Sequence, residues 1–236
     1  MLKLLTTANA KTSKGEALGY LTGILYLAPA SIGVPNICPG SSTGCRAVCL
    51  YRAGRGRFTN VQNARKNKTA LFHTERAVFM QALFENVAAV ERKAIREGLK
   101  PCIRLNGTSD IRYEKMKFKA AGRTASIMDH FPHIQFYDYT ALPAHSRLRF
   151  APPNYDLTFS LKEDNSKRAL EAIAGQGMRV AAVYREPQEG TAHIAGEAFP
   201  VIDGDKHDLR FLDPQSCIVA LKAKGEAKHD TTGFVQ

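Results

Sequence analysis

Short, continuous apolar runs recur along this chain of 236 residues, and each run ends in polar residues. Continuous rather than alternating apolar residues are typical of parallel strands whose two faces are both covered. Helical periodicity between the runs predicts right-handed strand–helix–strand units. The segments that predict strands, each with its polar end, are 23–30, 101–110, 133–140, 155–161, 178–185 and 217–225. The expected helices lie at 60–98 (with one break), 114–132 and 166–177.

Six or seven strands at this spacing predict a single α/β domain over residues 1–236, built around a mostly parallel sheet. We expect a partial or complete (β/α) barrel, and a doubly wound sheet is the alternative. No apolar run is long enough to cross a membrane, and the N-terminus lacks the apolar stretch of a signal peptide. We therefore expect a cytoplasmic protein.

Polar residues follow the predicted strands, and in parallel α/β folds the functional site lies beyond the carboxyl ends of the strands. Turn chemistry is the alternative interpretation, because Asn, Gly, Asp and Ser are also the commonest turn residues. Since several successive strands end in this way, we favour a shared site that binds cofactor and substrate. The candidate residues are Asn106, Gly107, Thr108, Ser109, Asp110, Asp138, Thr140 and Ser160.

A loop at residues 36–58 holds three of the five cysteines, Cys38, Cys45 and Cys49, with the spacing C-x6-C-x3-C. Three thiolates can ligate three irons of a [4Fe–4S] cluster and leave the fourth iron for another ligand. Zinc with a fourth ligand from elsewhere, or unligated structural cysteines, are the alternatives. Because zinc sites usually use C-x2-C pairs, the wider spacing favours the cluster. Cys102 and Cys217 begin apolar strands, where free cysteines are expected to be small buried hydrophobes.

Basic residues are in excess, with 33 Lys and Arg against 22 Asp and Glu, a formal net charge of +11. This excess favours a nucleotide or nucleic acid as partner, and a solvated basic surface is the alternative. Four arginines flank the cysteine loop, and we expect them to lower the pKa values of the thiols and to offset the charge of a cluster. They are Arg46, Arg52, Arg55 and Arg57.

Three stretches of the chain are distinctive in wording: "CPGSSTGCRAVCLYRAGRGRF" (38–58), "IRLNGTSDI" (103–111) and "DGDKHDLRFLDP" (203–214), the last followed by "IVALKAKG" (218–225). Together they resemble the gene product 88 family of bacteriophage proteins. The resemblance implies a phage or prophage origin, and with it a location in the cytoplasm of the infected host cell. It implies little about mechanism.

The order of strand, three-cysteine loop and helix also resembles radical S-adenosylmethionine enzymes, which share a partial (β/α) barrel. The resemblance implies that the three loop cysteines hold a [4Fe–4S] cluster and that Tyr51 flanks the cofactor. It also implies that Asn106, Gly107 and Thr108 lie where that superfamily binds the methionine amino group. The implied activity is that of an enzyme that cleaves S-adenosylmethionine and acts on a nucleotide or nucleic acid.

Two other functions are open on the sequence. The stretch 51–68 interleaves aromatic and basic residues, as surfaces that track phosphates and stack bases do. It favours a non-catalytic iron–sulfur or zinc protein that binds nucleic acid or a host protein. An enzyme of phosphate chemistry would instead bind Mg²⁺ through Asp203, Asp205 and Asp208. A turn followed by an edge strand is the simpler interpretation of those aspartates.

Overall fold

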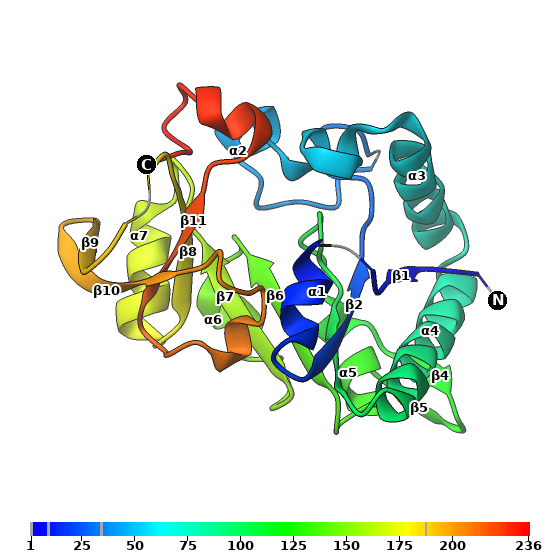
Figure 1. Cartoon of the computed structure of the whole chain (residues 1–236). Helices are drawn as coiled ribbons and strands as arrows, with labels where there is room; N and C mark the ends of the chain where they lie inside the picture. The colour runs from blue at the N-terminus through cyan, green and yellow to red at the C-terminus, as the bar shows by residue number, and fades with distance from the viewer. Residues whose placement is uncertain (1, 9, 34, 187) are drawn as a thin grey trace.

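In the computed structural model of the chain, which describes residues 2–8, 10–33, 35–186 and 188–236, one sheet has nine strands in the order β1-β2-β3-β6-β7-β8-β11-β10-β9 (Figure 1). All neighbouring strands from β2 to β10 in this order run parallel. These strands are β2 (Tyr20–Leu25), β3 (Lys100–Arg104), β6 (Gln135–Thr140), β7 (Tyr155–Ser160), β8 (Arg179–Tyr184), β11 (Ile218–Lys222) and β10 (Glu197–Asp203). The edge strands β1 (Leu5–Thr6) and β9 (Thr191–Ile194) pair antiparallel with β2 and β10.

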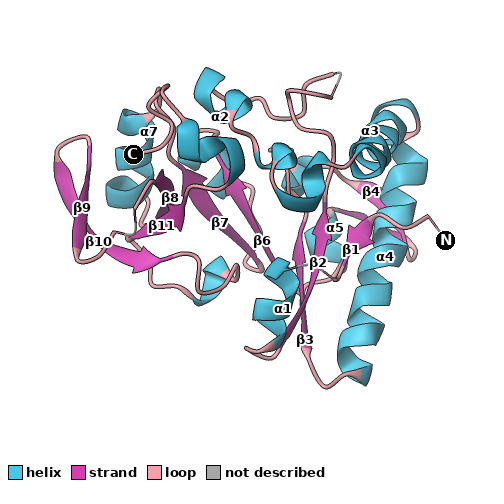
Figure 2. Cartoon of the chain, turned by 45° about the horizontal axis from the view of Figure 1, so that its top comes forward, coloured by secondary structure: helices cyan, strands magenta, loops and turns pink. Residues whose placement is uncertain are grey.

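Both faces of the sheet are covered, which explains the continuous apolar runs in the sequence. On one face lie α4 (Arg76–Arg96), α5 (Ile127–His130) and α7 (Ser166–Leu170), which continues into a π-helical turn, η4 (Glu171–Gly175) (Figure 2). The short helix α6 (Ala144–Leu148) packs into the same core. The other face is covered by α1 (Ala10–Glu16) and by the short turn η5 (Arg210–Leu212).

Successive residues of one strand serve the two faces, because side chains alternate along a strand. Ile103 and Phe136 belong to the main core beneath α4, whereas their neighbours Cys102 and Tyr137 pack against Leu209 on the opposite side. All four of these strand residues are fully buried. The expectation of a mixed α/β fold with a mostly parallel sheet is therefore confirmed.

The sheet is open, so the expectation of a complete barrel is wrong. Closure would require β1 to pair with β9, and within the described ranges these strands pair only with β2 and β10. The first parallel strand also ends earlier than the apolar run at 23–30 predicts, because β2 stops at Leu25. The break expected within 60–98 is present, since α3 (Thr59–Thr74) and α4 are separated at Glu75.

Residues 114–132, all of which the structure describes, do not form the single helix that the sequence predicted. A single turn, η3 (Tyr113–Lys115), is followed by a hairpin of β4 (Phe118–Ala120) and β5 (Arg123–Ala125), and only then by α5. Ala121 and Gly122 connect the hairpin with positive φ values of 47° and 77°. Two consecutive residues with positive φ form the tight turn that matches the twist of paired strands. The apolar residues of this stretch were consistent with a helix, but most of the stretch forms the hairpin instead.

The remaining helical elements lie in the cysteine loop and at the C-terminus. They are α2 (Thr43–Ala47), η1 (Leu50–Arg52), η2 (Gly54–Arg57) and η6 (Gly225–His229). Within the described residues, no helix has the length and apolar character needed to span a membrane.

Candidate cysteine-lined site

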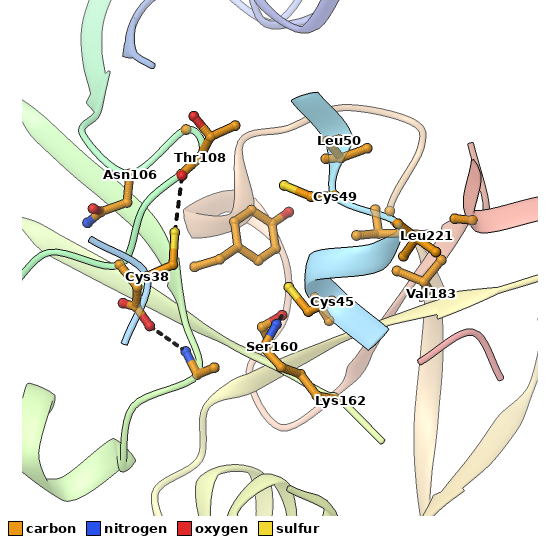
Figure 3. A pocket seen from close by; sticks show the side chains of 18 of the residues that line it. Cys38, Cys45, Cys49, Leu50, Asn106, Thr108, Ser160, Lys162, Val183 and Leu221 are labelled. Atoms are coloured by element: carbon orange, nitrogen blue, oxygen red, sulfur yellow. Dashed lines mark hydrogen bonds between the residues drawn. The ribbon is translucent and has the colours of Figure 1, made fainter. Parts of the chain in front are cut away.

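A cavity of about 360 Å³ opens at the carboxyl ends of the parallel strands. Cys38, Cys45 and Cys49 line this cavity, and their side chains extend into the same space (Figure 3). The strand-end residues that line it with them are Asn106, Gly107, Thr108, Ser109, Asp110, Thr140 and Ser160. The structure thus brings together the cysteine loop and nearly all of the polar strand ends singled out in the sequence.

The thiols lie in a largely apolar, partly buried environment. Burial, together with the smaller effect of the neighbouring Cys49 and Cys45, raises the pKa of Cys38 to about 12. Burial also raises the pKa of Cys49. Cys38 Sγ donates a hydrogen bond of 3.2 Å to the carbonyl oxygen of Thr108. Because metal-ligating cysteines are thiolates, a metal centre bound here would have to displace these protons.

Glu163 clamps the cysteine loop to the sheet. It lies just beyond β7, where its Oε2 accepts a hydrogen bond of 2.7 Å from Ser42 Oγ and its Oε1 accepts one of 2.6 Å from Gly44 N. Ser42 in turn caps α2 by accepting from Cys45 N at 3.1 Å. Gly44 is required for this approach, because a Cβ there would lie 2.9 Å from both carboxylate oxygens. The position of Cys45 therefore depends on Glu163.

Replacement of Glu163 by alanine is expected to release the loop. Loss of two hydrogen bonds to a charged acceptor should lower the free energy of unfolding by about 2 kcal/mol. In addition, the thiol of Cys45 should react faster with a maleimide reagent under native conditions. Urea unfolding and timed thiol labelling measure the two effects. The adjacent, exposed Asp164 serves as control as Asp164→Ala, and equal labelling rates in the two variants would contradict the clamp.

The turn after β3 docks against the end of β2 and against the loop. Thr108 Oγ1 donates to the carbonyl of Leu27 at 2.6 Å, and Asp110 N donates to the carbonyl of Ile37 at 2.9 Å. A Cβ on Gly107 would lie 2.7 Å from the ring of Tyr26. Gly107 therefore serves close backbone packing, while its neighbours carry the polar atoms of the cavity wall.

Asp138, expected among the cofactor contacts, lies beneath the cavity and is not one of its lining residues. Its side chain is 1% exposed and accepts hydrogen bonds from Asn106 N at 2.7 Å, Asn106 Nδ2 at 3.1 Å and Tyr155 OH at 2.9 Å. Burial raises the pKa of Asp138 to about 7. Asp138 thus positions Asn106, whose own side chain lines the cavity.

Arg147 is fully buried and was not singled out in the sequence. It pairs with Asp110 through Nη1 at 2.7 Å and with Glu114 through Nε at 2.7 Å. The same guanidinium donates to Thr140 Oγ1 at 3.1 Å and to Tyr155 OH at 3.0 Å. Because Asp110 and Thr140 both line the cavity, Arg147 holds two of its polar groups from behind.

The basic flank of the loop lies at the surface. Arg46 and Arg52 are exposed and hydrogen-bond Ser41 O and Tyr51 OH, while Arg55 and Arg57 are exposed. The pKa values of Cys38 and Cys49 are raised by burial rather than lowered by this flank. Tyr51 is 5% exposed and is not among the residues that line the cavity.

The cations whose charges favour the thiolate of Cys49 are Arg65 and Lys162. Both are buried, and Lys162 lines the cavity. The burial of Arg65 could have been predicted from the sequence, because Arg65, Thr69 and Phe72 have the i, i+4, i+7 spacing of one helix face, and this face of α3 is buried. Lys162 follows β7 by two residues and lies beyond the strand end at Ser160.

Cys102 and Cys217 are 0% and 1% exposed and pack among apolar side chains, as expected. In the described part of the chain, no three His, Cys, Asp or Glu side chains are gathered around one metal-ion position. The aspartates considered for Mg²⁺ have other partners. Asp205 pairs with Lys224, and Asp208 pairs with Arg104 at 2.7 Å.

Comparisons with known proteins place the chain in a family. Neither the curated proteins nor the solved structures gave a match. The model of the family described as "Gene product 88" matches residues 3–236. This match covers nearly the whole chain and agrees with the three distinctive stretches of sequence. The chain therefore belongs to the gene product 88 family.

Proposed function

We propose that Cys38, Cys45 and Cys49 hold a [4Fe–4S] cluster and that the protein uses it to cleave S-adenosylmethionine in a reaction on a nucleotide or nucleic acid. The observation that carries the proposal is that three thiols and a ring of polar strand ends line one cavity. When bound, such a cluster would supply an electron to the sulfonium of S-adenosylmethionine.

The donor set fits a cluster. A cubane is ligated by one thiolate at each of several corners, so its cysteines surround a volume rather than a single ion position. The three loop cysteines line a common cavity in this manner. Arg65 and Lys162 supply positive charge beside Cys49, which would offset the negative charge of a thiolate-ligated cluster. The three-residue donor set leaves one iron for an exogenous ligand.

The rest of the cavity fits a cofactor with both polar and apolar parts. Ser109 and Ser160 line the cavity, and their hydroxyl groups can bond amino and ribose groups. An apolar wall lies beside Cys45 and Cys49 and can exclude water from the reacting atoms (Figure 3). Its side chains are Val48, Leu50, Val183, Leu221, Ala227 and Phe234.

The decisive experiment is reconstitution with iron and sulfide under anaerobic conditions, followed by addition of S-adenosylmethionine and dithionite. We expect iron and sulfide to be retained, and chromatography to detect 5′-deoxyadenosine even without substrate. A Cys49→Ala variant treated identically is the control and should give none. A fully loaded protein that neither binds nor cleaves S-adenosylmethionine would refute the activity. Zinc without iron in the protein as isolated would refute the cluster itself.

A second candidate function has its own observation. The segment after Cys49 exposes basic and apolar side chains side by side: Arg52, Arg55 and Arg57 are exposed, and Leu50 and Phe58 are 50% and 52% exposed. Such a surface suits nucleic acid, because cations track phosphates and aromatic rings stack on bases. A cluster or zinc ion would then stabilise the loop that presents this surface. This function is favoured if the loaded protein leaves S-adenosylmethionine intact.

A further inference from the structure

The same cavity has a cationic rim that belongs to neither the cysteine loop nor the polar strand ends. Lys14 on α1 and Lys224 after β11 both bind Asp205, the first through the backbone carbonyl and the second through Oδ1. The backbone N–H of Lys222 donates to Asp205 Oδ2 at 2.8 Å. These contacts join α1, the end of β10 and the end of β11, which lie together in front of the sheet (Figure 1). All four residues line the cavity.

The charges around the cavity do not cancel. The three carboxylates that line it are each held by a cation: Asp110 by Arg147, Asp205 by Lys224 and Asp208 by Arg104. Lys14 and Lys162 also line it, but the hydrogen bonds of their ammonium groups go to neutral acceptors, the carbonyl of Asp205 and the hydroxyl of Ser160. The cavity therefore carries surplus positive charge.

The guanidinium that balances Asp208 is itself part of the cavity lining. Arg104, at the end of β3, lines the cavity although it is only 5% exposed, and its Cζ lies 4.5 Å from the ring centre of Tyr139. Its Nε is buried with no hydrogen-bond partner among the described residues. The neighbouring His207 also lines the cavity, and burial lowers its pKa.

We propose that Lys14, Lys222 and Lys224, arranged around Asp205, form a binding subsite for the phosphate groups of a small phosphorylated molecule. Ammonium groups are point charges that suit phosphate oxygens. All three lysines are exposed and so are accessible to a ligand in the mouth of the cavity. The cations surround a cavity, whereas a nucleic acid strand needs a groove that follows its backbone. The subsite rests on the proposed function only in so far as both use this cavity, and it does not require the cluster.

The test uses the metal-free full chain and isothermal titration calorimetry in buffer without phosphate. Pyrophosphate and adenosine 5′-diphosphate should both bind, while adenosine should bind at least tenfold more weakly than the diphosphate. Lys14→Gln and Lys224→Gln should each weaken binding of both phosphate compounds about tenfold, the effect of losing one hydrogen bond to a charged group. Higher salt should weaken binding as well, because the charges are near the surface.

Lys228→Gln is the matched control, since Lys228 is exposed on η6 and is not among the cavity-lining residues. Equal affinity for adenosine and its diphosphate, or unchanged binding in both rim variants, would overturn the proposal. Tighter binding of a single-stranded oligonucleotide than of the diphosphate, lost in the same variants, would overturn the assignment to a small molecule. A Cys45→Ala chain that still binds pyrophosphate while failing to cleave S-adenosylmethionine separates this subsite from the cluster.

Discussion

Single replacement of Cys38, Cys45 or Cys49 by alanine is expected to abolish the binding of iron and sulfide. Each cysteine supplies one of three thiolates to the proposed cluster, and a vacant corner leaves an iron without its protein ligand. Iron and sulfide analysis after anaerobic reconstitution, together with the visible absorption spectrum, measures the loss.

Cys102→Ala and Cys217→Ala are the matched controls for this experiment. Both residues are buried at the starts of strands: Cys102 shares a hydrogen bond of 3.2 Å with Thr22, and Cys217 donates one of 3.2 Å to the carbonyl of Pro214. These variants should retain full iron content, even if their stability falls slightly. Undiminished iron in Cys45→Ala would exclude the three-cysteine site.

Replacement of Arg147 by methionine is expected to destabilise the fold by about 3–5 kcal/mol, because removal of one partner leaves buried charges uncompensated. The guanidinium has no solvent exposure and pairs with Asp110 and Glu114, whose carboxylates would remain in the core. A loss of this size is a large fraction of the roughly 5–15 kcal/mol of a typical domain. Urea unfolding followed by circular dichroism measures the change.

Arg149→Met is the control for Arg147. Arg149 lies two residues further on, at the end of α6; it is exposed, and its guanidinium carbon lies 5.6 Å from the ring centre of Phe150. Its effect should stay within about 0.5 kcal/mol. A double variant that adds Glu114→Gln to Arg147→Met should recover part of the lost stability, because one orphaned carboxylate is removed. Equal stability of the Arg147 and Arg149 variants would show that the ion pairs of Arg147 with Asp110 and Glu114 do not stabilise the fold.

The candidate site has two layers. The cysteine loop faces the cavity, and the network of Arg147, Asp138 and Tyr155 lies behind the strand ends and holds their polar groups in place. Buried polar networks of this kind are rigid when every member is satisfied. Damage to the inner layer should therefore reach the cavity through Asp110 and Asn106, even though Arg147 and Asp138 do not line it.

Local sequence pattern was sufficient for the parts of this protein that depend on chain neighbours. Continuous apolar runs predicted the parallel strands, since a strand covered on both faces has no polar side. The carboxyl ends of parallel strands must share one edge, so the convergence of Asn106, Thr140 and Ser160 followed from the strand order alone. The three cysteines are close together in one loop of the sequence, and this loop lies at the carboxyl ends of the same strands.

Tertiary structure decided the rest, because the deciding contacts join residues far apart in the chain. The role of a carboxylate depends on which side chains lie around it: Asp138 is buried beneath Asn106 and accepts its hydrogen bonds, whereas Asp205 binds two lysines. Likewise, charge near a thiol depends on distance in space, so Arg65 and Lys162 act on Cys49 while the adjacent arginines point to solvent. The hairpin at Ala121 and Gly122 and the open sheet edges depend on backbone pairing, which apolar periodicity does not encode.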